Sequence, residues 1–101
     1  MELGTVVAER DFELVDEAGV RRPVLLRLGL PRPADVDWVC PFEIADGQTS
    51  IAHVAYGVDG VQALLLALAR ADADLRFHAR SAGARLEWLG RDELGLPGVR
   101  P

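Results

Sequence analysis

The sequence predicts an α+β fold in which one long amphipathic helix packs on one face of an antiparallel sheet of four to five strands. Three observations support this class. Alternating apolar and polar residues fill much of the first half of the chain, a long segment of helical periodicity follows, and the connections between the expected strands are short. Short connections join antiparallel neighbours, whereas parallel strands need a crossover of about a dozen residues. The expected order of elements is β-β-β-β-α-β.

The first two strands are expected to form a hairpin. Residues 6–15 alternate between apolar and polar side chains, a period of two that is typical of a half-buried strand. The polar positions include Glu9, Asp11 and Glu13. Residues 16–19 form a short turn that ends in glycine, and residues 24–30 alternate again.

A second pair of strands is expected after a rigid, proline-containing connection at residues 31–35. Residues 38–44 form the third strand, and one of its faces carries Trp38, Cys40, Phe42 and Ile44. Pro41 lies within this strand and has no N–H to donate, which predicts a bulge or an unpaired position there. An Asp-Gly turn signal at residues 46–47 leads into the fourth strand at residues 51–56.

The helix has the clearest signals in the chain. Asp59 precedes Gln62 by three residues, a capping-box pattern that marks both as structural helix caps. One stripe at helical spacing is expected to face the sheet, and it consists of Val61, Leu64, Leu65, Leu68, Ala71 and Leu75. Gly83 is a plausible stop. Residues 85–89 form a last short strand, and residues 95–98 a loop.

Composition limits the classes of function. The 101 residues fit a single domain, residues 1–101, with an ordered core at residues 5–97. A net charge of −5 argues against nucleic acid and anionic membranes as partners. The chain shows no secretory signal and no apolar run that could cross a bilayer, and its one cysteine fits a reducing compartment. A cytoplasmic location is therefore expected.

Three segments resemble a known family. They are Trp-Val-Cys-Pro-Phe-Glu-Ile at residues 38–44, Gly-Val-Asp-Gly-Val-Gln-Ala-Leu at residues 57–64 and Leu-Gly-Leu-Pro at residues 94–97. Together they resemble a family of small bacterial proteins described only as a domain of unknown function. The resemblance implies a small α+β fold and an uncharacterised role, and it offers no catalytic residues to transfer.

The candidate chemistry favours a protein without a catalytic centre. Cys40 could pair with His53 or His78 as nucleophile and base. However, Cys40 falls on an apolar strand face, where cysteine behaves as a small, inert hydrophobic residue. Two histidines and one cysteine on different elements are also a poor metal-ligand set. The turn at residues 57–60 lacks the glycine spacing and the lysine of a phosphate-binding loop, so no cofactor is expected.

Two surfaces are candidates for binding a partner. The first is the acidic strand face with Glu9, Asp11 and Glu13. The second is a helix patch with Leu66 and Phe77, which a helical wheel places away from the main stripe and which could contact an unknown protein partner or a second subunit. The leading hypothesis is a non-catalytic protein-interaction module, with an immunity-type protein as one analogy.

The alternative hypothesis is a small-molecule-binding protein or minor enzyme. Its pocket would lie between the helix and the sheet, near Trp38, Cys40 and Tyr56. A filled core at this place would leave nothing to bind.

Overall fold

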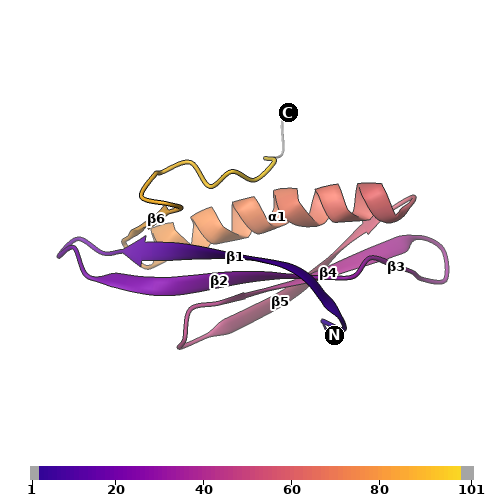
Figure 1. Cartoon of the computed structure of the whole chain (residues 1–101), viewed down its shortest axis with the longest axis horizontal. Coiled ribbons are helices and arrows are strands. Elements are labelled where there is room, and N and C mark those ends of the chain that lie inside the picture. Colours follow the sequence, from indigo (N-terminus) through magenta and orange to yellow (C-terminus); the bar gives the residue numbers. More distant parts are fainter. Residues whose placement is uncertain (1–2, 99–101) are drawn as a thin grey trace.

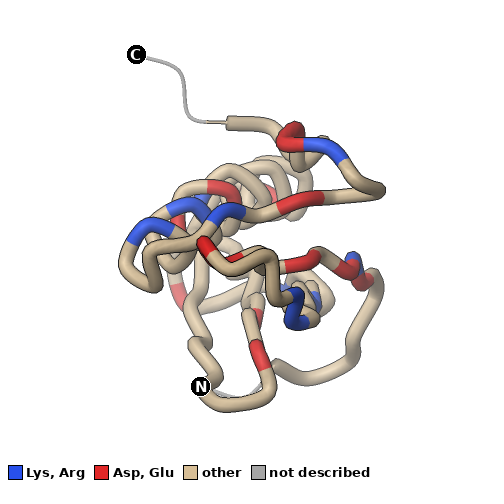
Figure 2. The backbone as a smooth tube through the Cα atoms, turned by 90° about the vertical axis from the view of Figure 1, so that its left-hand side faces the viewer, with Lys and Arg blue, Asp and Glu red and all other residues tan. Residues whose placement is uncertain are grey.

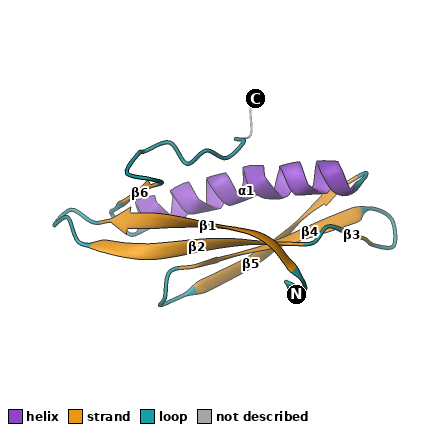
Figure 3. Ribbon diagram, viewed as in Figure 1, coloured by secondary structure: helices purple, strands orange, loops and turns teal. Residues whose placement is uncertain are grey.

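One helix lies across one face of an antiparallel sheet, which confirms the α+β class (Figures 1 and 3). The structure is a computed structural model, and it describes residues 3–98. The elements, in chain order, are β1 (Val6–Val15), β2 (Arg21–Gly29), β3 (Arg32–Pro33), β4 (Trp38–Ala45), β5 (Ser50–Gly57), α1 (Gly60–Ser81) and β6 (Arg85–Glu87). The order is therefore β-β-β-β-β-α-β, with one strand more than expected before the helix.

Strand β4 organises the sheet because it has three neighbours. The strands β3-β4-β2-β1-β6 follow one another through the sheet, β5 pairs with β4 as well, and every pairing is antiparallel. Along one side, β4 pairs with β5 over its full length. Along the other, residues 42–45 pair with β2 and residues 38–39 pair with β3. Pro41 pairs with Val54 of β5, so it is neither bulged nor unpaired on that side, and it lacks a partner only along the other side of β4, in the gap between β2 and β3.

Two local predictions need correction. The segment at residues 31–35 is more than a connection, because Arg32 and Pro33 pair with β4 as the short strand β3. The last strand ends at Glu87 and does not reach residue 89. Leu89 and Gly90 both have positive φ, at 54° and 78°, so they form a turn that a strand cannot contain, and Trp88 forms a single bridge with Arg91 across it.

The helix begins as predicted. The Asp59 side chain accepts a hydrogen bond from the Gln62 backbone N–H at 2.8 Å, and the Gln62 side chain accepts one from the Val58 N–H at 2.7 Å. Both carboxyl and amide oxygens thus satisfy N–H groups that have no partner within the helix. Gly83, with φ of 64°, ends the helix in the left-handed conformation that glycine adopts without strain. No helix in residues 3–98 is long and apolar enough to span a membrane.

The face of α1 that meets the sheet differs from the predicted stripe. Val61 and Leu65 are 68 % and 52 % exposed, so they do not face the sheet. The buried helix residues are mostly alanines: Ala63, Ala67, Ala69, Ala71, Leu75 and Ala79. Leu64 and Leu68 pack at the border of this face, where they are partly buried.

The sheet explains why small residues face it. Its inner face already supplies large side chains to the core, among them Phe12, Leu14, Leu26, Phe42 and Ile44. Alanines opposite these side chains let the helix approach closely and keep the interior close-packed without overfilling it. The predicted stripe was built mainly from large apolar residues of the helix. In the structure, large side chains of the sheet lie opposite mostly small side chains of the helix.

The C-terminal segment runs beside the helix and is fastened to the sheet by Arg10 (Figure 1). The Arg10 Nη1 atom donates to the carbonyl oxygens of Leu94 and Gly95 at 3.0 and 3.1 Å. Its guanidinium also lies over the Trp88 ring, 3.8 Å from the centroid. Gly95 has φ of 69°, and a Cβ atom there would collide with the Trp88 ring. The close approach of this segment therefore requires glycine.

Candidate functional site

The side of α1 that faces away from the sheet carries large exposed apolar residues. Leu66 is 44 % exposed and Phe77 is 65 % exposed, and the misplaced stripe residues Val61 and Leu65 are exposed as well. Ala73 adds a small exposed apolar position within about 40° of Leu66 and Phe77 on the helical wheel. We call these five residues, together with the exposed arginines of α1, the outer helix face. Val61 and Leu65 lie about 100° or more around the helix from Leu66 and Phe77, so they are further exposed apolar residues but do not extend this patch.

Every exposed charge on α1 is positive. The charged residues of the helix that are exposed are Arg70, Arg76 and Arg80. The two helix carboxylates are turned to the sides, where Asp72 and Asp74 have side chains only 14 % and 24 % exposed. In a chain with a net charge of −5, the outer helix face is therefore an apolar surface with basic flanks. It suits a partner with apolar residues bordered by carboxylates.

The acidic strand face is largely neutralised by neighbouring arginines. Glu9 accepts a hydrogen bond from Arg27 Nε at 3.0 Å, and Glu13 forms an ion pair with Arg21 at 3.2 Å. Arg27 also approaches Glu43 on β4 at 3.6 Å. Within residues 3–98, Asp11 is the member of the predicted row that has no ion pair. The acidic strand face therefore consists mainly of ion pairs between neighbouring strands, and not of a row of free carboxylates.

The predicted pocket residues do not share one side of the sheet. Cys40 is completely buried and pairs across the strands with Ala55, whereas Tyr56 pairs with Val39 and is 56 % exposed. Successive side chains of a strand point to opposite faces, so Tyr56 points away from Trp38 and Cys40. The Cys40 Sγ donates to the Gly29 carbonyl at 3.5 Å, and burial raises the pKa of the thiol. These features describe a core cysteine.

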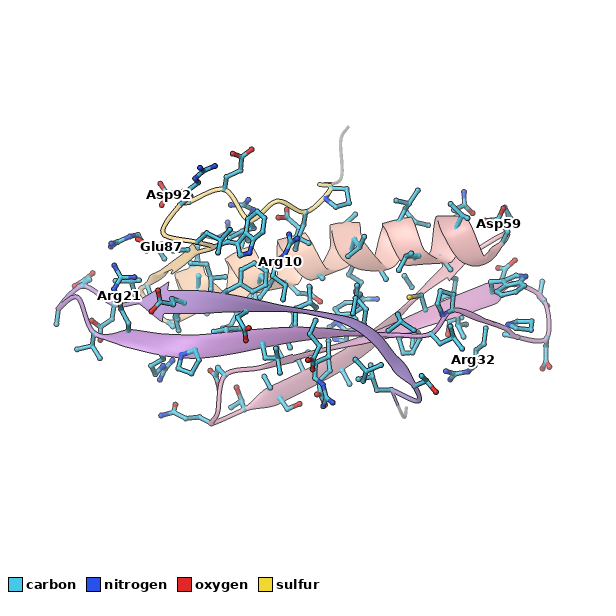
Figure 4. All side chains as sticks on the ribbon, in the orientation of Figure 1. Arg10, Arg21, Arg32, Asp59, Glu87 and Asp92 are labelled. Atoms are coloured by element: carbon cyan, nitrogen blue, oxygen red, sulfur yellow. The ribbon has the colours of Figure 1, made fainter. Side chains whose placement is uncertain are left out.

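Charged groups of both signs gather where α1 ends, close to β6 and the β1–β2 turn. Figure 2 looks onto this end of the molecule, and Figure 4 labels Arg21, Glu87 and Asp92 there. Glu87 is buried, and the hydrogen bond from Arg21 at 2.9 Å is the main reason that its pKa is lowered. The same contact raises the pKa of Arg21. Arg85 also pairs with Glu87, at 3.2 Å.

Residues 8–98 match the model of a family described as a domain of unknown function, DUF6968. The chain belongs to this family. The matched range includes all three segments on which the resemblance was based. No curated protein and no solved structure matches the chain.

The segments behind the resemblance have structural roles in this DUF6968 domain. Trp38 packs against Gly60, and the apolar residues that follow it in β4 belong to the core. Gly57 lies so close to the start of α1 that a Cβ atom would collide with the Ala63 backbone nitrogen. Leu94, 1 % exposed, anchors the C-terminal segment. These residues therefore have structural roles in the fold.

Two histidine–aspartate pairs were missed by the sequence analysis. In the first, His78 on α1 contacts Asp46 in the β4–β5 turn, with 3.0 Å between Nε2 and Oδ2. Hydrogen bonds from the Thr49 and Gln48 backbone N–H groups hold the pKa of Asp46 at about 2. In the second pair, His53 Nδ1 lies 2.7 Å from Asp74 Oδ2. Both pairs join α1 to the β4–β5 hairpin, and neither histidine is hydrogen-bonded to Cys40.

These pairs connect α1 to the β4–β5 hairpin of the DUF6968 domain. Asp46 was considered only as a turn residue and His78 only as a possible base for Cys40 or a metal ligand, because 32 positions separate the two residues and no spacing rule connects them. Within residues 3–98, no three side chains of His, Cys, Asp or Glu come together as a potential metal site. The pairs therefore stabilise the contact between helix and hairpin.

A small apolar cavity lies between the helix and the sheet, although not at the predicted place. Its volume is about 160 Å³, and its walls include Leu26, Leu28, Leu68, Leu96 and Pro97. The C-terminal segment forms one side, and Arg10 lies at the border. No local pattern indicates this cavity, because it exists only once the C-terminal segment docks beside α1.

Proposed function

We propose that this DUF6968 domain is a non-catalytic protein-interaction module that binds its partner on the outer helix face. The observation that carries the proposal is the exposure of Leu66 and Phe77 on a helix whose buried face consists mostly of alanines. Aromatic and large aliphatic side chains dominate the energetics of protein interfaces, and contiguous exposed apolar patches commonly mark such sites.

The charges define the chemistry of the partner. Arg70, Arg76 and Arg80 border the apolar residues, although Arg70 pairs with Asp74 and Arg76 with Asp72. Glu9 and Glu13 are paired as well, so the exposed Leu66 and Phe77 are what make the outer helix face the stronger candidate. A partner that matches this surface presents apolar side chains flanked by Asp or Glu. An immunity-type role, in which the domain covers and blocks a toxin, is one specific form of this function.

A comparative pull-down tests the proposal. The bait is the wild-type chain, Phe77→Asp, or Val36→Asp. Val36 is a matched control because it is 92 % exposed and lies in the loop between β3 and β4, outside α1. We expect the same proteins with wild type and Val36→Asp, and their loss with Phe77→Asp. High salt should weaken the capture because it screens the arginines. Capture that is equal for all three baits, or absent at low and high salt, contradicts the proposal.

Sedimentation of the purified chain decides whether the partner is a second copy. A wild-type monomer agrees with a different protein as partner. A dimer that Phe77→Asp dissociates would replace that partner by a second copy of this chain, and would overturn the assignment of an acidic partner.

Small-molecule binding is the second candidate, favoured by the cavity of about 160 Å³ beneath the C-terminal segment. This volume is below the range of about 300–1,000 Å³ for ligand pockets, so the ligand would be small. Indole serves as a probe. Under this second function indole raises the melting temperature of the wild type, and Leu96→Trp, which fills the cavity, abolishes the effect. No shift in the wild type excludes it.

A further inference from the structure

A hollow of about 290 Å³ lies where α1 ends and β6 begins, and three arginines line it. Arg76 and Arg80 come from the last two turns of the helix, and Arg85 comes from β6. The floor is apolar and is formed by Ala79, Ala84 and Leu86. The hollow therefore combines convergent positive charge with an apolar base, and it is distinct from the patch of Leu66 and Phe77.

Much of the hydrogen-bonding capacity of these arginines is free. Arg76 uses only its Nε atom, which donates to Asp72 at 3.2 Å. Arg85 uses Nε and Nη2, both toward Glu87 at 3.2 Å. Arg80 forms no ion pair with a residue in 3–98. Each guanidinium has five N–H donors in a planar fork, so several donors remain for a ligand.

The acidic neighbours limit the charge of the hollow without closing it. Asp72 and Glu87 neutralise part of the charge of Arg76 and Arg85. Asp92 lines the hollow but lies within ion-pair distance of none of the three arginines. The negative charge of Asp92 would repel an anion in the hollow. Asp92 does not, however, occupy the N–H groups of the three arginines, so these remain available to the anion.

We propose that this hollow is a binding site for an anionic oxygen group, a carboxylate or a phosphate, carried on a ligand whose apolar part rests on Ala84 and Leu86. Guanidinium groups match the geometry of both anions and bind them through paired hydrogen bonds. The hollow shares Arg76 and Arg80 with the outer helix face. Binding of a small anion there needs no protein partner, so it is tested separately from the proposed interaction through Leu66 and Phe77.

NMR titrations of the full chain with inorganic phosphate and with acetate test this site at constant ionic strength. We expect saturable shifts of the arginine side-chain signals and of backbone signals at residues 76–92. Arg80→Gln should weaken the binding about tenfold, as expected for the loss of one charge-assisted hydrogen-bonding group. Asp92→Asn should strengthen it, because it removes the opposing charge. The tighter of the two probes identifies the class of anion.

Arg32→Gln is the matched control, because Arg32 lies at the opposite end of the molecule from Asp92 (Figure 4). It should leave the binding unchanged. Shifts that do not saturate with either anion overturn the proposal, as does an equal loss of binding with Arg32→Gln and Arg80→Gln. Melting curves of both variants show that the comparison is made between folded proteins.

Discussion

The two faces of α1 use apolar residues differently, because the buried face is mostly alanine and the exposed face carries large side chains. The inner face buries Ala63, Ala67 and Ala71 completely, whereas the outer face exposes Leu66 and Phe77. Leu64, Leu68 and Leu75 also pack on the inner side, yet Leu66 and Phe77 remain outside although burial of apolar area stabilises in proportion to its size. The comparison teaches that the inner face is adapted to close approach, and that the large residues outside need another explanation, for which we have proposed the binding of a partner.

The largest expected effect is a difference in the free energy of unfolding between variants of Leu75 and Phe77, which are only two positions apart. Leu75 is completely buried and Phe77 is 65 % exposed. Leu75→Ala should lower the free energy of unfolding by about 2–5 kcal/mol, because it leaves a cavity in the core. Phe77→Ala should change it by less than about 0.5 kcal/mol. Chemical denaturation of both variants measures the difference, and equal losses would show that Phe77 is part of the core.

Acid should weaken the attachment of the inner face to the β4–β5 turn. The folded-state pKa of Asp46 is lowered to about 2 from an ordinary value of 3.8, so its contribution is present above pH 4 and is lost as the pH falls toward 2. The shift corresponds to about 2 kcal/mol of stability. Unfolding curves between pH 5 and pH 2 measure it. Asp46→Asn should flatten this dependence, and an unchanged slope in the variant would contradict the role of Asp46.

The cap at the start of α1 supports both faces equally, so its loss should affect stability alone. Asp59→Ala should cost about 0.5–2 kcal/mol, since it removes the acceptor for the Gln62 N–H. Asp59→Asn and Asp59→Ser should recover much of the loss, because both side chains can still accept this bond. Thermal melts compare the four proteins. An Ala variant as stable as the wild type would reopen the turn at residues 57–60 as a functional element.

The smallest expected effect concerns the interior beneath the helix. Cys40 is completely buried and its thiol pKa is raised, so it should react with a thiol reagent far more slowly in the folded chain than in denaturant. The rate of modification in both conditions measures this. Reaction as fast in the folded chain would mean that the core opens easily around β4.

Periodicity and caps determined how much of this fold could be predicted. The alternation of β1, the strand pairs and the Asp59–Gln62 cap depend on neighbours in sequence, and all three were predicted correctly. The orientation of α1 was wrong at Val61 and Leu65, because it depends on how large the facing sheet residues are. The contact between Asp46 and His78 and the arginine hollow depend on elements that meet only in the folded chain, so no local pattern indicates them.

The most direct measurement of the central claim is photo-crosslinking from the outer helix face in living cells. A photoreactive phenylalanine analogue replaces Phe77 in one protein and Val36 in a control, and mass spectrometry identifies the attached peptides. The account predicts a specific crosslink from position 77 to a peptide with apolar residues flanked by Asp or Glu, weakened by Arg70→Glu. Equal crosslinking from positions 77 and 36, or attachment to peptides rich in Lys and Arg, would contradict it.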